Sequence, residues 1–148
     1  MRALIQRVEH ARVVVDGQTV GSCGAGLLIL LGVGADDTRA KAEKLWSKIS
    51  RLRIFADDKG KTNLSIADVG GEVCIVSQFT LYASCRKGNR PSFTKAAGPA
   101  LGEELYECFC ELAERDVPHV GRGVFGAMMD VELVNDGPFT VWLDTDAL

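Results

Sequence analysis

The alternation of hydrophobic and polar positions along the chain predicts strands in its first third. Arg2–Val8 and Arg12–Val20 are rich in apolar and β-branched residues, and Asp16-Gly17 predicts a tight turn inside the second segment. Gly26–Val33 is an uninterrupted apolar run, which is typical of a strand covered on both faces. The chain is therefore expected to open with a sheet.

Two later segments have the periodicity of amphipathic helices. Thr38–Arg51 places its apolar residues on one helical face, and Asp36, Asp37 and Thr38 offer acidic and capping groups at its start. Ala100–Arg115 places its apolar residues on one face in the same way. Both segments are predicted to be helices that pack on a sheet.

The order of these elements indicates a fold class. The remaining strand-like segments are Arg53–Phe55, Val73–Leu81, Met129–Leu133 and Phe139–Leu143. Asn135-Asp136-Gly137-Pro138 predicts a hairpin turn between the last two. We expect one mixed α/β (α+β) domain over residues 1–148, ordered as two strands, two strand–helix units and about three strands. Two helices cannot cover both faces of so many strands, so three layers (β/β/α) are predicted, with barrel-like sheets and both helices on one side.

Composition and charge narrow the class of protein. The 148 residues are 47% hydrophobic and 25% charged, as in one ordinary globular domain. The net charge of −3 argues against a generally polycationic nucleic-acid binder, although a local basic patch remains possible. The N-terminal segment lacks the apolar core of a secretory signal, and the longest apolar run, Ala25–Val33, is about half the length that crosses a bilayer. We expect a cytoplasmic protein with no membrane partner.

The cysteines indicate neither a disulfide framework nor a metal site. Their number is odd, no pair has C-x-x-C spacing, and only His10 and His119 could add imidazole ligands. We expect no metal, and we expect the thiols to behave as reduced small hydrophobic side chains. The five cysteines are Cys23, Cys74, Cys85, Cys108 and Cys110.

Three segments could carry chemistry, and each also has a plain structural explanation. Gly32-Val33-Gly34 lies where a dinucleotide loop would, but Asp37 occupies the position of the third glycine and would repel a pyrophosphate. We therefore predict a turn and a helix cap there. Val73–Leu81 changes from apolar to polar at Ser77, which fits either a strand end in solvent or a functional site.

The third segment is basic. No acidic residue occurs between Val73 and Gly102, and four basic residues fall within ten positions. This segment could bind a phosphate backbone or could simply be a solvated loop. Its basic residues are Arg86, Lys87, Arg90 and Lys95. The chain has no G-x-S-x-G motif, and neither histidine has an obvious nucleophile and carboxylate beside it, which argues against a triad hydrolase.

Several blocks together resemble the D-aminoacyl-tRNA deacylase family. They are Met1–Val8, Ser77–Leu81, Lys87–Phe93 and Leu133–Thr140, and they span essentially the whole chain in the family's order. The resemblance implies an enzyme that hydrolyses the ester of D-aminoacyl-tRNA, releasing free D-amino acid and tRNA without a cofactor. It implies rejection of L-aminoacyl groups, so that glycyl-tRNA, which has no side chain, is partly accepted.

The resemblance also implies roles for particular residues. The protein would be a homodimer in which Gly137-Pro138, as a cis unit, enters the partner's active site, where its carbonyls orient the substrate ammonium. Arg7 matches the position that holds this motif, and Asn135 belongs to the motif itself. Phe125 and Met129 match the pocket for the terminal adenine, although core packing is a competing role for both.

The catalytic hypothesis combines the resemblance with the chemistry of an activated ester. Backbone N–H groups around Gln78, Phe79 and Thr80 would stabilise the oxyanion, and Ser77 and Gln78 would shape the pocket. No residue supplies a base for Thr80, so we expect Thr80 to position groups while the 2′-hydroxyl of the substrate assists an attacking water.

Contact with the tRNA backbone is expected from Arg86, Lys87 and Arg90. Two alternatives stay open at this point. One is a non-catalytic tRNA-binding module that uses the same basic loop. The other is a thiol hydrolase with Cys74 or Cys85 as its nucleophile.

Overall fold

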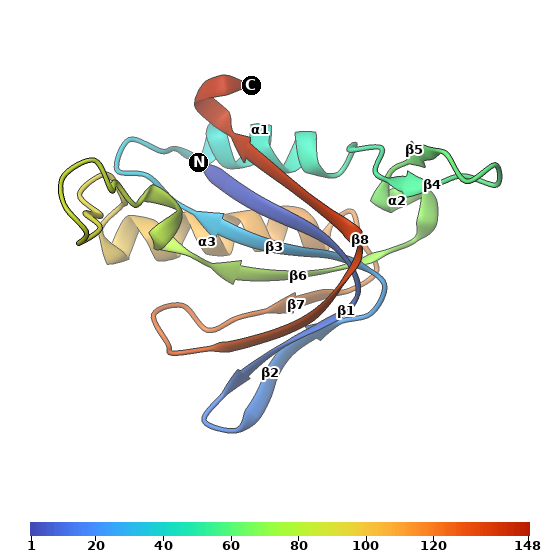
Figure 1. Ribbon diagram of the computed structural model, residues 1–148, viewed down its shortest axis with the longest axis horizontal. Coiled ribbons are helices and arrows are strands. Elements are labelled where there is room, and N and C mark those ends of the chain that lie inside the picture. Colours follow the sequence, from blue (N-terminus) through green and yellow to red (C-terminus); the bar gives the residue numbers. More distant parts are fainter.

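The computed structural model describes all residues 1–148. They form a six-stranded curved sheet with helices on one side and a separate two-stranded sheet (Figure 1). Its helices are α1 (Arg39–Ile49), α2 (Ile66–Val69) and α3 (Pro99–Glu114), with 3₁₀ turns η1 (Phe79–Tyr82) and η2 (Thr145–Ala147). Its strands are β1 (Arg2–Val15), β2 (Gln18–Cys23), β3 (Gly26–Gly32), β4 (Phe55–Ala56), β5 (Thr62–Leu64), β6 (Glu72–Ser77), β7 (Val120–Arg122) and β8 (Asp130–Asp144). None of the three helices combines the length and the hydrophobicity that a membrane-spanning helix needs.

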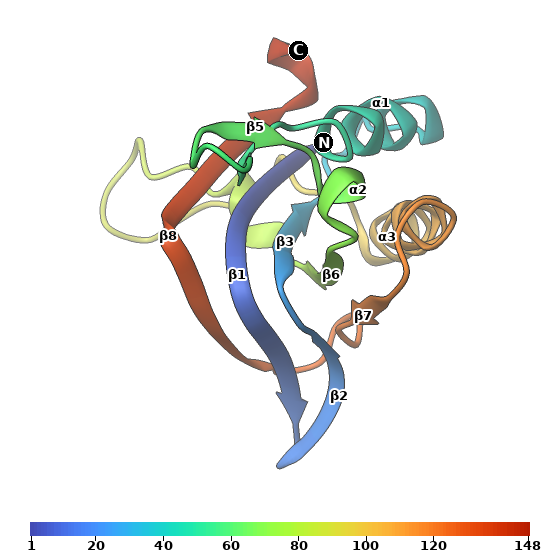
Figure 2. The ribbon, with the colours of Figure 1, turned by 90° about the vertical axis from the view of Figure 1, so that its right-hand side faces the viewer.

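Strand β1 organises the sheet. Along one edge it pairs with β8 from Arg2 to Val14, and along the other it pairs first with β3 and then with β2, all antiparallel. Strands β6 and β7 continue the sheet beyond β3 in parallel. The sheet curls strongly (Figure 2), so that β2 and β7 cross at Gly21 and Gly121, where any β-carbon would collide with the other backbone. The result is a nearly closed, barrel-like sheet.

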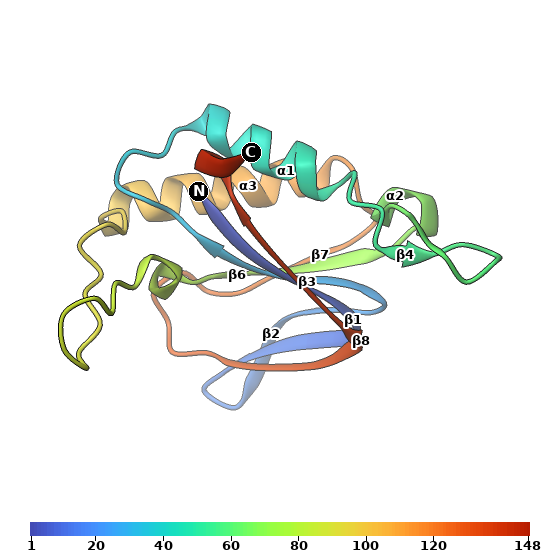
Figure 3. The ribbon, with the colours of Figure 1, turned by 45° about the horizontal axis from the view of Figure 1, so that its top comes forward.

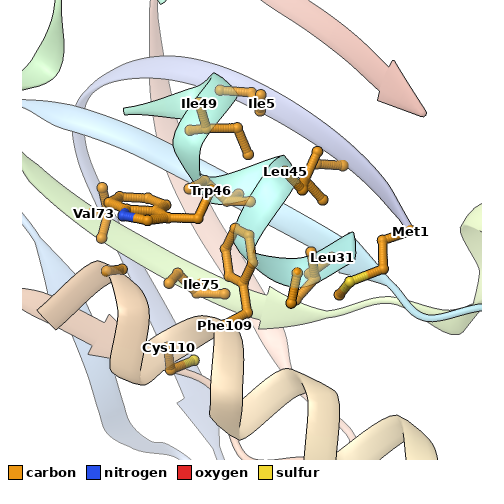
Figure 4. Packing of buried hydrophobic residues seen from close by; sticks show 14 of the residues in the cluster. Met1, Ile5, Leu31, Leu45, Trp46, Ile49, Val73, Ile75, Phe109 and Cys110 are labelled. Atoms are coloured by element: carbon orange, nitrogen blue, oxygen red, sulfur yellow. The ribbon is translucent and has the colours of Figure 1, made fainter. Parts of the chain in front are cut away.

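Two hydrophobic clusters fill the spaces that this curvature creates. The larger one lies between the sheet and helices α1 and α3, where Trp46 and Phe109 meet edge to face at 5.7 Å between ring centroids (Figure 4). The smaller one lies inside the barrel and includes Val13, Cys74 and Val76. The expected three layers are confirmed, but the two β layers are halves of one curved sheet rather than separate sheets.

The two long helices are confirmed, whereas the capping prediction for the first is wrong. Thr38 is the N-cap residue of α1, yet its side chain makes no capping hydrogen bond. Asp37 does not cap the helix either, because its carboxylate is engaged by the Met1 ammonium, with an N···O distance of 2.7 Å.

The end of the chain differs from the prediction. No hairpin turn forms at Asn135–Pro138, and β8 is a single strand rather than two. The reason is that both halves of β8 pair with β1: Thr140 lies opposite Gln6 and Asn135 lies opposite Val8. The residues between them have only Arg7 opposite and form a bulge, which we call the β8 bulge (Asp136–Phe139).

Other boundaries also move. The predicted strand Val73–Leu81 is wrong beyond Ser77, where the chain turns into η1. Arg2–Val8 and the first part of Arg12–Val20 belong to one long strand, β1, and the second part of Arg12–Val20 begins β2. The turn predicted at Asp16-Gly17 is confirmed. The short strand expected at Arg53–Phe55 is found at Phe55–Ala56, and β5, α2 and β7 were not predicted.

Candidate functional site

The candidate active site begins at the carboxyl end of β6. The Gln78 N–H donates to the Leu31 carbonyl at 2.7 Å, and the chain then turns into η1. The N–H groups of Phe79 and Thr80 open this 3₁₀ turn and donate to no backbone or side-chain acceptor in the protein. They are therefore two adjacent donors that a ligand oxygen can accept from.

The side chains of this turn are paired with each other. Gln78 Nε2 donates to Thr80 Oγ1 at 2.5 Å, and no base lies within hydrogen-bonding distance of the Thr80 hydroxyl. The expectation that the Gln78 N–H belongs to the donor set is wrong, because β3 already accepts it. Gln78 can act only through its side chain, and Thr80 is unsuited to be a nucleophile.

Two glycines provide the surface on which η1 rests. A β-carbon on Gly32 would lie 3.1 Å from the Leu81 side chain, and one on Gly34 would lie 2.7 Å from the Tyr82 hydroxyl. The Gly32-Val33-Gly34 segment is therefore shaped for contact with η1, which the sequence pattern did not reveal. Arg2 adds a hydrogen bond to the Leu81 carbonyl at 3.0 Å and lies over the Tyr82 ring at 4.3 Å.

A buried carboxylate secures the end of η1. Asp37 accepts hydrogen bonds from the Tyr82 hydroxyl at 3.1 Å, from the Gly34 N–H at 2.6 Å and from the Met1 ammonium. Burial alone would raise the pKa of Asp37, but the Met1 ammonium, the Gly34 N–H and Lys41 outweigh it and hold the pKa below its usual value. The charged form of Asp37 is thus part of the folded structure.

Phe125 and Met129 lie on the other side of β6. The Gly123 N–H donates to the Ile75 carbonyl at 2.9 Å, which brings the segment after β7 to the carboxyl end of β6. The Phe125 ring lies against Tyr106, and the Met129 sulfur lies against Gly123. Both side chains are half-buried, and they pack against different clusters: Phe125 against the larger one beneath the helices and Met129 against the smaller one inside the barrel.

The basic loop (Ala83–Gly98) continues from η1 at the same end of the molecule (Figure 3). Arg86, Lys87 and Arg90 are exposed, and none of them forms an ion pair. The loop is closed at its neck by backbone hydrogen bonds between Ser84 and Ser92. The loop that carries the three predicted RNA-binding residues thus begins directly after the candidate catalytic turn.

Arg7 supports the β8 bulge. Its Nε donates to the Asp136 carbonyl at 3.0 Å, its Nη1 donates to the Ile54 carbonyl at 2.6 Å, and its guanidinium lies 4.9 Å from the Phe139 ring centroid. Asn135 closes the bulge, because its Oδ1 accepts from the Phe139 N–H at 2.8 Å. The Gly137–Pro138 peptide is cis, as the resemblance implies, and both residues are exposed.

The β8 bulge and η1 are not brought together within one chain. Arg2 contacts η1, whereas Arg7, which contacts the bulge, lies five residues further along β1. Because an antiparallel strand rises about 3.4 Å per residue, the two contacts are roughly 17 Å apart along the strand. Gly137 and Pro138 therefore lie well away from the free N–H groups of Phe79 and Thr80 of the same chain.

The structure offers little support for thiol or metal chemistry. Cys74 is fully buried, and the hydrogen bond with Cys23 and burial both raise its pKa, so it is a thiol rather than a nucleophilic thiolate. Cys85 is exposed in the basic loop, with no hydrogen-bond partner that could act as a base. No three His, Cys, Asp or Glu side chains cluster closely enough to hold a metal ion.

Comparisons with known proteins agree on one family. The family model described as D-Tyr-tRNA(Tyr) deacylase matches residues 4–144. A D-aminoacyl-tRNA deacylase of Roseiflexus castenholzii is 57% identical over 98% of this chain and 92% of its own length. One of Thermotoga petrophila is 54% identical over 100% of this chain and 99% of its own length.

Solved structures share the fold. One described as c-Myc DNA Unwinding Element Binding Protein has a TM-score of 0.92 and 38% identity, covering 97% of this chain and 98% of that one. A probable eukaryotic D-amino acid tRNA deacylase has a TM-score of 0.80 at 19% identity, covering 96% of this chain and 97% of that one. Because the family model and the two curated relatives are described as deacylases, the comparisons favour an enzyme over the alternative of a non-catalytic tRNA-binding module. The chain belongs to the D-aminoacyl-tRNA deacylase family and hydrolyses D-aminoacyl-tRNA.

Proposed function

We propose that this chain hydrolyses the ester of D-aminoacyl-tRNA at the start of η1, in a pocket that the β8 bulge of a second copy completes. The observation that carries the proposal is the pair of free N–H groups at Phe79 and Thr80. Backbone donors fixed in this way stabilise a negative oxygen at no reorganisation cost. The rigid support from Gly34, Tyr82 and Arg2 holds them in place.

The chemistry follows from these donors. A water oxygen attacks the ester carbonyl carbon, and the carbonyl oxygen becomes an oxyanion that accepts from the Phe79 and Thr80 N–H groups. The 2′-hydroxyl of the terminal ribose assists by relaying the water proton towards the 3′-oxygen, so that breaking the C–O bond releases D-amino acid and the tRNA 3′-hydroxyl. Thr80 contributes by position, because its hydroxyl is already bonded to Gln78.

Chirality is set by the β8 bulge of the partner. Gly137 and Pro138 are exposed, and Arg7 and Asn135 hold their segment away from the β1–β8 ladder, free to enter another subunit. Their carbonyls would bind the substrate ammonium and leave room for hydrogen, but not for a side chain, on the L side of the α-carbon. Glycyl-tRNA, which lacks a side chain, is then partly accepted.

The rest of the substrate follows the surface around η1. Phe125 and Met129 are half-buried and offer apolar surface for the terminal adenine, and Ser77 is the last residue of β6 before the turn. Arg86, Lys87 and Arg90 contact the tRNA backbone further out. Since aminoacyl-tRNA is made and used inside the cell, we also propose that the protein works in the cytoplasm.

A mixing experiment tests the shared site. The Phe79→Pro variant removes one oxyanion donor, and the Gly137→Ala variant disturbs the bulge, because a β-carbon there would lie 2.8 Å from the Phe139 nitrogen. Each variant alone should be nearly inactive on D-tyrosyl-tRNA. When the two variants are co-expressed in equal amounts, half of the dimers contain one chain of each kind. Each mixed dimer has one site built from two unmutated segments and one site built from two mutated ones. The mixture should therefore recover about a quarter of wild-type activity.

Two results would count against the proposal. A mixture no more active than its two components would show that each chain builds its own site. Equal hydrolysis of D-tyrosyl-tRNA and L-tyrosyl-tRNA by the wild-type protein would show that the bulge does not select chirality.

A further inference from the structure

An exposed aromatic pair stands beside the proposed oxyanion donors. The Phe79 ring is 56% exposed, and Phe93 from the basic loop meets it edge to face, with ring centroids 5.0 Å apart. The other exposed aromatic side chain, Trp142, is already stacked with the Arg2 guanidinium at 5.8 Å. The Phe79 ring has no such cover, so it leaves an apolar face open to solvent.

This pair lies on the path between two parts of the proposed substrate site. Across the carboxyl end of β6, Phe125 and Met129 lie on the β7 side, and η1 lies on the β3 side against Gly32. The basic loop lies beyond η1, because its return segment pairs with the chain leaving β3 through Gly34 and Ala96. The single-stranded 3′ end of a tRNA that runs from the proposed adenine pocket to the basic loop would therefore pass Phe79 and Phe93.

The charge around the pair fits a nucleic acid rather than an apolar protein surface. No carboxylate occurs from Val73 to Gly102, and Arg86, Lys87 and Arg90 are exposed without acidic partners. An exposed aromatic ring in basic surroundings is the usual platform for an unpaired base, because every base has a face that can stack. This surface therefore combines a place for a base with places for its phosphates.

We infer that Phe79 and Phe93 form a stacking platform for the nucleotide base immediately before the terminal adenosine of the tRNA. The inference rests on the proposed function, since it needs the ester at η1. Stacking is tolerant of base identity, so the platform recognises an unpaired 3′ end rather than a sequence. Phe93 supplies the edge that holds the Phe79 ring upright, and the base covers the open face of Phe79.

The test compares three substrates that carry the same D-amino acid. They are D-tyrosyl-adenosine, a D-tyrosyl dinucleotide with cytidine before the adenosine, and the same dinucleotide with its cytosine removed. The abasic compound keeps the added phosphate, so the ratio of kcat/KM between the two dinucleotides reports the base alone. The wild-type protein should favour the intact dinucleotide by about 5- to 100-fold, as expected for one base stacked on an aromatic ring.

Variants of Phe93 assign this preference to the platform. Phe93→Leu should reduce the ratio to about one while leaving kcat/KM on D-tyrosyl-adenosine unchanged, and Phe93→Tyr should keep the ratio, because stacking needs the ring. Val69→Ala, which truncates an equally apolar side chain that is 41% exposed on α2, is the matched control and should change nothing.

Each other outcome overturns the inference. If Phe93→Leu slows all three substrates equally, Phe93 only supports the turn. If the ratio survives in Phe93→Leu, Phe93 takes no part in holding the base, and the two-ring platform is refuted. If Phe93→Leu converts a dimer to a monomer in sedimentation, the surface belongs to a contact between copies. Failure of the wild-type protein to cleave any of these D-esters would instead refute the proposed function.

Discussion

Replacing Phe79 by proline removes one of the two free N–H groups and no hydrogen bond that the folded protein makes. Phe79 is the first residue of η1, where proline is favoured, and the preceding Gln78 has an extended φ of −144° that tolerates a following proline. The variant should therefore fold. Loss of one oxyanion donor should lower the rate of ester cleavage about 10²- to 10³-fold, or roughly 3–4 kcal/mol of barrier.

The matched control is Phe79→Ala, which removes the same ring but keeps the N–H. Single-turnover cleavage of D-tyrosyl-tRNA is measured with enzyme in saturating excess, so that all of the tRNA is bound. The rate then reports the chemical step alone, and any loss of tRNA affinity in the two variants does not affect the comparison. Phe79→Ala should then cleave at nearly the wild-type rate. Rates for the two variants within about threefold of each other would mean that this N–H stabilises less than 1 kcal/mol of the transition state, and the oxyanion assignment would be refuted.

Three further predictions concern neighbouring groups. Thr80→Ala should keep most of the single-turnover activity, whereas a loss of about a thousandfold would mean that the hydroxyl takes part in the chemistry. Neutralising Arg86, Lys87 and Arg90 together should lower the slope of log K for tRNA binding against log salt by roughly 2–3, and an unchanged slope would remove the loop from the interface. The lowered pKa of Asp37 stabilises the fold above the unfolded-state pKa of about 4, and this contribution is lost as pH falls towards the folded-state value. The unfolding free energy of the wild-type protein, measured by urea titration, should therefore fall as the pH is lowered below about 4. In Asp37→Asn, the share of this fall that comes from protonating Asp37 should be absent.

Hydrophobic periodicity is sufficient to predict the two long helices, because the same apolar face that creates the pattern is the face that packs on the sheet. The face of α3 that carries Leu105 and Phe109 is buried, as its periodicity predicts. Where the sequence prediction was wrong, a contact distant in sequence decides the structure. The Asn135–Pro138 pattern is a good turn signal, but the pairing of β8 with β1 on both sides converts the turn into a bulge.

The site was harder to predict because its donors carry no sequence signature. Ser77–Thr80 could be identified from polar residues at a strand end and from resemblance, but the free N–H groups depend on where β6 stops. Strand β6 can end there because Gly32 and Gly34, which have no side chains, leave room for Leu81 and Tyr82 of η1 to pack against the backbone. The signal that the sequence offers is the spacing of Gly32 and Gly34 with Tyr82 further along, and the same two glycines also fit a plain turn before α1.

The pairing on either side of the β8 bulge allows this segment to change in length. Between the pair Gln6–Thr140 and the pair Val8–Asn135, β1 advances two residues while β8 moves back five, so the bulge holds three extra residues. These extra residues have no partners of their own in the ladder, and each flank of β8 is held by its own pairing with β1. A residue added to or deleted from the bulge would therefore leave both flanks in place. The segment that we propose to select chirality can thus lengthen or shorten during evolution without disturbing the barrel.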